Sequence, residues 1–149
     1  MRNQFDINQA NSKNREAIIS LLQSESLPVE DLPQDLRNFF TATGNGFIIG
    51  AIGLETYERN GLLRSLVVKS EYRKMKIAEH LINELEKLAK DLRLQSIYLL
   101  TETAQAYFAK KGYETIARNE APDSIMKSTE FSHVCPASAI LMRKTLTHH

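Results

Sequence analysis

A basic run follows an apolar run near the middle of the chain. Residues 62–68 are mostly Leu and Val, residues 73–76 include three basic side chains, and a strong helical pattern begins at about Met75. The N-terminus of a helix offers unpaired N–H groups and a partial positive charge, and basic side chains add full charges there. The pattern predicts a phosphate site at residues 73–78; the alternative is an ordinary connection with solvated lysines.

One arginine lies inside the apolar run itself. Side chains alternate along a strand, so Arg64 is predicted to share a face with Leu62 and Leu66. A charge among such neighbours needs a partner, which favours a site over a surface position.

The elements that must position these residues include a series of strands. Gly44-Asn45-Gly46 and Asn60-Gly61 are hairpin-turn signals, so three central strands should form an antiparallel meander. The continuous apolar run at 96–101 predicts a strand buried on both faces. The expected strands cover residues 5–7, 37–43, 47–57, 62–68, 96–101, 113–118 and 137–144.

Helical spacing indicates the other elements. The strongest pattern covers residues 75–92, where a stripe of large aliphatic side chains runs from Ile77 to Leu92. A short helix is expected to stop at Gly112, the usual left-handed residue after a helix. The remaining helices are expected at 11–25, 31–38, 104–111 and 122–130, which gives an α+β domain with a mixed sheet.

Composition limits the class of protein. The 149 residues are 42% hydrophobic with net charge +1, so they fit one globular domain without a global signal for nucleic acid or membrane. Cys135 is the only cysteine, and no secretory or membrane-spanning pattern is present, so we expect a cytoplasmic protein. We assign residues 1–147 to the domain and interpret His148 and His149 as a tag remnant.

The order of elements resembles the GNAT family of acetyl-CoA-dependent N-acetyltransferases over residues 5–145. The family motif Arg/Gln-x-x-Gly-x-Gly/Ala is matched by residues 73–78, and the family's short helix before Gly-aromatic is matched at Gly112-Tyr113. The resemblance implies a mixed, mostly antiparallel sheet of about six to seven strands flanked by helices. It also implies acetyl-CoA as cosubstrate, no metal, a small-molecule amine as acceptor and neither nucleic acid nor membrane as partner, with a homodimer left open.

A closer resemblance is to the GNAT branch found with arsenic-resistance genes, whose members are named for arsenic resistance or amino-acid N-acetylation. Four segments carry it, at residues 53–55, 62–66, 98–101 and 135–139.

The chain departs from the family motifs at two sites. Lys76 stands where the family has its central glycine, and Lys74 replaces another frequent glycine, so charge is expected to compensate for a less close backbone approach. Phe108 stands where many members have a tyrosine acid. Tyr107 lies about 100° away round the helix and should point elsewhere. A thiolate is a good leaving group, so an acid is helpful but not required.

The resemblance implies roles for the site residues. CoA would lie along Leu66, Val67 and Val68, with a backbone N–H near Val67 or Val68 as oxyanion donor. The other cofactor-binding positions are Arg73, Lys74, Met75, Lys76, Ile77, Ala78 and Phe108.

The acceptor side is implied in the same way. Arg64 would hold an acceptor carboxylate, and Arg118 could share that recognition. Glu102 is a further candidate for substrate binding, because it follows a buried strand whose C-terminal end faces the cofactor in the family. Glu55, or a water chain, would take the proton of the amine; the alternative is a structural partner for an arginine.

The function implied is direct transfer of acetyl from acetyl-CoA to the primary amine of a small, amino-acid-like molecule. One alternative is a non-catalytic acyl-CoA-binding sensor or interaction module, motivated by Lys76 and Phe108, and another is acetylation of a protein amine. Cys135 with His133 is a weaker candidate for a nucleophile, because a lone cysteine is more often structural and the family's transfer is direct. Cys135, His133 and Glu130 are a weaker candidate for a metal site, because no second cluster completes a coordination shell.

Overall fold

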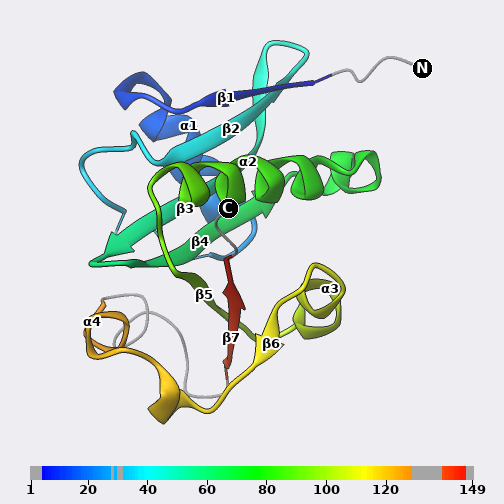
Figure 1. Ribbon diagram of the computed structural model, residues 1–149. Coiled ribbons are helices and arrows are strands. Elements are labelled where there is room, and N and C mark those ends of the chain that lie inside the picture. Colours follow the sequence, from blue (N-terminus) through cyan, green and yellow to red (C-terminus); the bar gives the residue numbers. More distant parts are fainter. Residues whose placement is uncertain (1–4, 28, 30–31, 129–138, 147–149) are drawn as a thin grey trace. The chain divides into compact units, whose positions relative to one another are not determined.

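The computed structural model describes residues 5–27, 29, 32–128 and 139–146. Within these residues the strands pair in the order β1-β2-β3-β4-β5-β7-β6 (Figure 1). The β1–β2, β2–β3, β5–β7 and β6–β7 pairs are antiparallel, and the β4–β5 pair is parallel. This confirms the predicted mixed, mostly antiparallel α+β sheet. The strands are β1 (Asp6–Gln9), β2 (Phe39–Gly44), β3 (Phe47–Tyr57), β4 (Asn60–Val68), β5 (Ser96–Thr101), β6 (Glu114–Thr115) and β7 (Ile140–Thr145).

The described helices include four α-helices, and most begin and end close to the predicted bounds. They are α1 (Arg15–Ser24), α2 (Ile77–Asp91), α3 (Gln105–Lys110) and α4 (Asp123–Met126). Three 3-10 helices accompany them: η1 (Ser12–Asn14), η2 (Ser70–Met75) and η3 (Arg118–Glu120). The Asn11 side chain caps η1, which leads directly into α1.

The chain divides into two compact units, residues 1–54 with 65–88 and residues 55–64 with 89–149. In the first unit, α2 and α1 cover opposite faces of β3, with α2 in front and α1 behind in Figure 1. A Cβ on Gly50 would lie 3.1 Å from Ile77 Cγ2 and 3.3 Å from Leu81 Cδ1, so α2 packs against the backbone there. The next residue, Ala51, points to the opposite face and belongs to the core of α1 and Phe39. A glycine on β3 therefore lets α2 approach closely.

In the second unit, β5 lies at the centre. It pairs with the first residues of β4 on one side and with β7 on the other. Residues 96–99 are all buried, as the apolar run predicted. Tyr98 packs in a core that also contains Leu62, Ala121, Ile125 and Leu141.

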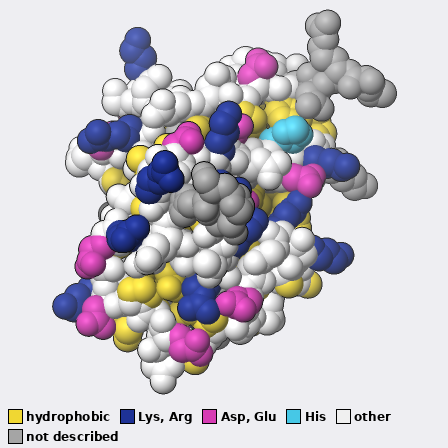
Figure 2. Space-filling view, in the orientation of Figure 1, with side chains coloured by type: hydrophobic (Ala, Val, Ile, Leu, Met, Phe, Trp, Pro, Cys, Tyr) yellow, Lys and Arg dark blue, Asp and Glu magenta, His cyan; other side chains and the backbone are white. Residues whose placement is uncertain are grey.

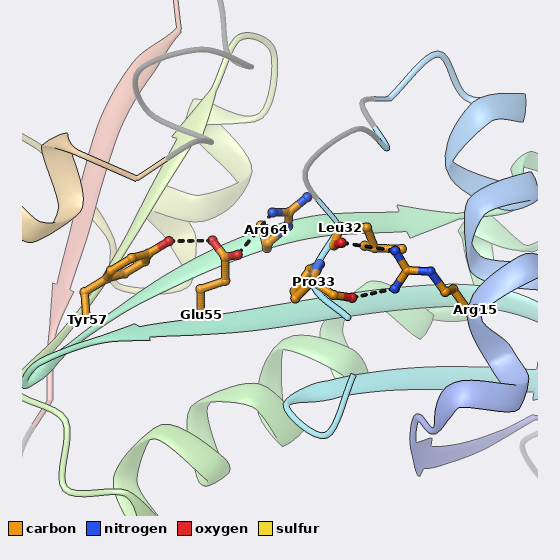
Figure 3. A network of polar contacts seen from close by, with 6 residues as sticks. All are labelled: Arg15, Leu32, Pro33, Glu55, Tyr57 and Arg64. Carbon is orange, nitrogen blue, oxygen red and sulfur yellow. Dashed lines mark hydrogen bonds and ion pairs between the residues drawn. The ribbon is translucent and has the colours of Figure 1, made fainter. Parts of the chain in front are cut away.

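Two local predictions at the hairpin and at residues 31–38 are wrong. The turn between β3 and β4 is Glu58-Arg59, and Asn60-Gly61 instead begins β4, where it pairs with Ser96 and Ile97. The described residues 32–38 form no helix. The Arg15 guanidinium donates hydrogen bonds to the carbonyl oxygens of Leu32, at 3.1 Å, and Pro33, at 2.5 Å (Figure 3).

The side chain of Asp35 adds to this irregular structure, because it accepts the backbone N–H of Arg37 at 2.9 Å. Side-chain contacts with the backbone of this kind compete with helical hydrogen bonds. The backbone N–H of Arg37 also holds the pKa of Asp35 below its ordinary value.

Two further corrections concern element ends. Leu92 was predicted to belong to the buried stripe, but α2 ends at Asp91 and Leu92 is exposed. The expected strand at 113–118 is reduced to β6, so Arg118 lies in η3 rather than at a strand end.

None of the helices in the described part of the chain is long and apolar enough to cross a membrane. Figure 2 shows basic and acidic side chains interspersed over the face that it draws.

Candidate active site

The predicted phosphate loop lies in the first unit, between β4 and α2. It was expected to be a short turn, but η2 fills it, and only Lys76 separates η2 from α2. Lys69 N donates to Ile49 O at 2.7 Å, and Tyr72 N donates to Lys69 O at 2.8 Å. These bonds fix the start of the loop to β3. The first N–H groups of α2 have no carbonyl one turn earlier in the helix, which makes its start suitable for an anion.

Lys76 adopts a backbone conformation that glycine reaches more easily than other residues do. Its φ is +61° and its ψ is 25°, in the left-handed region. Its carbonyl oxygen accepts His80 N at 3.2 Å, so the residue also begins the hydrogen bonds of α2. The side chain is exposed. The loop therefore keeps a glycine-like path and carries a positive charge at the same position.

The other loop positions divide into buried and exposed residues. Ile77 is fully buried and Ala78 is half-buried, so they contribute backbone rather than side chain. Met75 ends η2, and Lys74 lies within it. The backbone N–H of Glu71, the Ser70 hydroxyl and nearby Lys69 hold the pKa of Glu71 below its ordinary value.

Arg73 is the loop residue with the most defined side-chain contacts. Its Nε donates to Val68 O at 3.3 Å, and its Nη2 forms an ion pair with Glu25 Oε1. Glu25 follows α1 and is 48 residues away in sequence, so no sequence signal linked it to this loop.

A polar network joins β3 and β4 in the second unit. Arg64 Nη1 lies 3.3 Å from Glu55 Oε2, and Tyr57 Oη donates to Glu55 Oε1 at 2.9 Å (Figure 3). The Arg64 side chain is 1% exposed and that of Glu55 is 19% exposed. The predicted need of Arg64 for a partner is thus met by Glu55.

The network brings together two residues that were assigned separate roles. Glu55 was a candidate base and Arg64 a candidate carboxylate binder, and the alternative for Glu55 was an arginine's partner. Tyr57 was missed, although Glu55 and Tyr57 are two apart on a strand and must share a face.

The regular alternation of β4 does not continue through Ser65. This residue has a φ of +57°, which is rare for a side chain inside a strand. Left-handed residues within strands typify bulges, which interrupt the ladder and redirect side chains. Leu66 is half-buried, whereas Val67 and Val68 are buried.

The two aromatic residues of α3 differ as predicted. Phe108 is 5% exposed and meets Tyr113 edge-to-face, with ring centroids 5.5 Å apart. Tyr107 is 37% exposed, and Lys111 Nζ lies 5.5 Å from its ring centroid. Gly112 has a φ of +94°, which confirms the predicted helix end.

The remaining acceptor candidates lie in the second unit. Glu102 is exposed after the end of β5. Arg118 Nη2 donates to Ala139 O at 2.7 Å, so this guanidinium fixes the backbone before β7. Glu130, His133 and Cys135 lie outside the described residues; within them, no three His, Cys, Asp or Glu side chains could hold a metal ion.

Comparison with known proteins places the chain in a family. The family model of the acetyltransferase (GNAT) domain matches residues 35–115. An uncharacterized N-acetyltransferase from Chlorobaculum tepidum is 28% identical over 120 residues, which are 79% of this chain and 77% of that protein.

Solved structures show the same fold. N-acetylglutamate synthase from Neisseria gonorrhoeae, complexed with coenzyme A and N-acetyl-glutamate, superposes with a TM-score of 0.83 at 17% identity, over 99% of this chain. The chain spans only 36% of that synthase. Rv2747 from Mycobacterium tuberculosis, in complex with CoA and NLQ, gives a TM-score of 0.82 at 21% identity over 95% of this chain and 99% of that one. With the family model matching more than half of its residues, the chain belongs to the GNAT family of acetyltransferases.

Proposed function

We propose that this protein transfers an acetyl group from acetyl-CoA to the primary amine of a small, amino-acid-like acceptor. The neutral amine attacks the thioester carbonyl carbon, a tetrahedral oxyanion forms, and the C–S bond breaks to release CoA thiolate. The amine proton passes to Glu55 or to water. The match to the family model supports acetyl transfer as the class of reaction. The structures of N-acetylglutamate synthase and Rv2747 were both solved with CoA.

CoA would bind along Leu66–Val68 with its pyrophosphate at residues 73–78. The left-handed Lys76 supports this assignment, because that conformation is the one that favours glycine, the family's residue at this position. A backbone N–H at Val67 or Val68 would stabilise the oxyanion. The irregularity at Ser65 supports a role for this part of β4, because bulges often lie beside active sites.

On the acceptor side we propose that Arg64 acts through Glu55. The guanidinium holds one carboxylate oxygen and Tyr57 holds the other, so the carboxylate has a fixed orientation. A carboxylate has about four lone-pair sites, and these two donors leave others to accept a proton. We further propose Arg64 and Arg118 as contacts of an acceptor carboxylate, and Glu102 as another contact of the acceptor.

An amino-acid-like acceptor agrees with the sequence motifs of the arsenic-resistance branch. The synthase relative was solved with N-acetyl-glutamate, which is a product of this chemical class. The single cysteine in 149 residues suits work in a reducing compartment such as the cytoplasm.

The test is to incubate the protein with acetyl-CoA and a panel of amino acids and their analogues, while following free thiol. Turnover is expected with at least one carboxylated amine. CoA binding without turnover on any amine would support the non-catalytic sensor instead. Replacing Arg73 and Lys76 together by alanine should weaken CoA binding, and unchanged affinity would refute the phosphate site.

A further inference from the structure

We propose that Glu25 is a built-in counterion of the cofactor loop: it pairs with Arg73, competes with the pyrophosphate for that guanidinium, and so lowers the affinity for CoA. This inference rests on the proposed CoA site. Glu25 would be a positioning residue, because it acts through Arg73 and need not touch the ligand.

The first observation is that Glu25 stands where local physics disfavours an acid. It is the C-cap residue of α1, where the helix dipole is negative, and the last turn of α1 contains no basic residue. An acidic side chain at the C-terminus of a helix needs a nearby positive charge, and for Glu25 that charge is the guanidinium of Arg73. A residue that breaks a local rule in this way often serves a site.

The second observation is that Glu25 is the less exposed member of the pair, on a backbone that is held by hydrogen bonds. Its backbone N–H donates to Leu22 O at 3.1 Å, and Leu27 N donates to the same oxygen at 2.9 Å. The Glu25 side chain is 22% exposed, whereas that of Arg73 is 57% exposed. The Arg73 guanidinium is therefore the more accessible of the two groups to a ligand.

The third observation concerns the donors of Arg73. A guanidinium has five N–H groups, and the contacts with Val68 O and Glu25 use two of them. The other three N–H groups can contact a phosphate, which would then share the guanidinium with Glu25 and weaken its pairing. One guanidinium would then serve two anions, and the carboxylate would repel the pyrophosphate.

Linkage makes this effect reciprocal: if Glu25 weakens CoA binding, bound CoA weakens the Glu25–Arg73 pair equally. A loop with four basic residues, Lys69, Arg73, Lys74 and Lys76, would otherwise hold the cosubstrate and its CoA product alike. The counterion would favour release of CoA after each turnover.

The experiment is calorimetric titration of CoA into the full chain and its variants. Glu25→Gln keeps a hydrogen-bond acceptor but removes the charge, and we expect the Kd for CoA to fall about fivefold. Glu25→Asp keeps the charge and should stay within about twofold of the parent protein. Glu16→Gln is the matched control, because Glu16 is exposed in the first turn of the same helix.

Two further readouts separate competition from a structural role. In an Arg73→Gln background, Glu25→Gln should change the Kd less than about twofold, because the partner is gone. The Kd of the Glu25→Gln variant should also depend more steeply on salt, because the loop has gained net positive charge.

The outcomes are distinguishable. If no variant binds CoA, both the CoA site and this inference are overturned. If the parent protein binds CoA and Arg73→Gln weakens it, but Glu25→Gln leaves the Kd unchanged or raises it, only the counterion role is wrong. An equal gain from Glu16→Gln would also overturn it, because the effect would then be a general change of net charge.

Discussion

Lys76→Gly should make the protein more stable and, at the same time, a weaker binder of CoA. Lys76 has a φ of +61° between η2 and α2. Glycine reaches this region without a steric penalty, whereas a side chain there meets its own backbone. The substitution relieves that strain and removes one positive charge from the proposed phosphate site.

The magnitude follows from two opposing terms. A left-handed conformation costs a residue with a Cβ roughly 1–2 kcal/mol. Glycine loses roughly 0.4–1 kcal/mol more chain entropy on folding. The expected net gain is therefore about 0.5–1 kcal/mol. For a chain of this length, that corresponds to a rise in Tm of about 1–4 °C. The lost charge should raise the Kd for CoA about fivefold.

The assay is urea denaturation followed by circular dichroism, with CoA titration on the same samples. Arg93→Gly is the matched control for the backbone, because Arg93 is exposed, also has a φ of +61° and follows α2. It should gain similar stability without any change in CoA affinity. Lys76→Ala is the control for charge, because alanine keeps the Cβ: it should lose CoA affinity and gain less stability.

The reasoning fails if Lys76→Gly is no more stable than the parent protein while Arg93→Gly gains stability. It fails in a different way if Lys76→Gly binds CoA more tightly. Close approach of the backbone would then matter more than the charge of the lysine.

Three other substitutions test the structure. A Cβ on Gly53 would lie 2.4 Å from Phe39 Cζ, so Gly53→Ala should lower the free energy of unfolding, measured by urea denaturation, by about 2–3 kcal/mol. Adding Phe39→Leu should recover part of this loss. A Gly53→Ala protein as stable as the parent protein would contradict this packing. Arg64→Gln leaves the half-buried Glu55 without its ion-pair partner and should lower the free energy of unfolding by about 2 kcal/mol. A loss below about 0.5 kcal/mol would mean that the ion pair is not formed in solution. Tyr107→Phe should leave kcat within about twofold, since its ring lies on the exposed side of α3; a tenfold loss would instead make its hydroxyl the missing acid.

The sequence alone determined most of the fold, because hydrophobic periodicity is local and strong in this chain. The apolar run at β5, the Gly44–Gly46 turn and the stripe of α2 predict those elements nearly at their observed bounds. Motif spacing likewise predicted the family, which the match to the family model confirms. The errors lie where a tertiary contact competes with a local preference. The Arg15 side chain binds the carbonyl oxygens of residues 32–33, which form no helix, and Asn60-Gly61 pairs with β5 as part of a strand instead of forming a turn.

Only the tertiary structure decided the partners of the charged residues. Arg64 was predicted to need a partner, and only the folded structure shows that this partner is Glu55. Glu25 and Arg73 are too far apart in sequence for any periodic pattern to relate them. The left-handed conformation of Lys76 could not be predicted from the sequence either, because lysine rarely adopts it. The connection between η2 and α2 imposes it. Side-chain type and spacing thus indicate what chemistry is available, and packing between distant segments decides which groups meet.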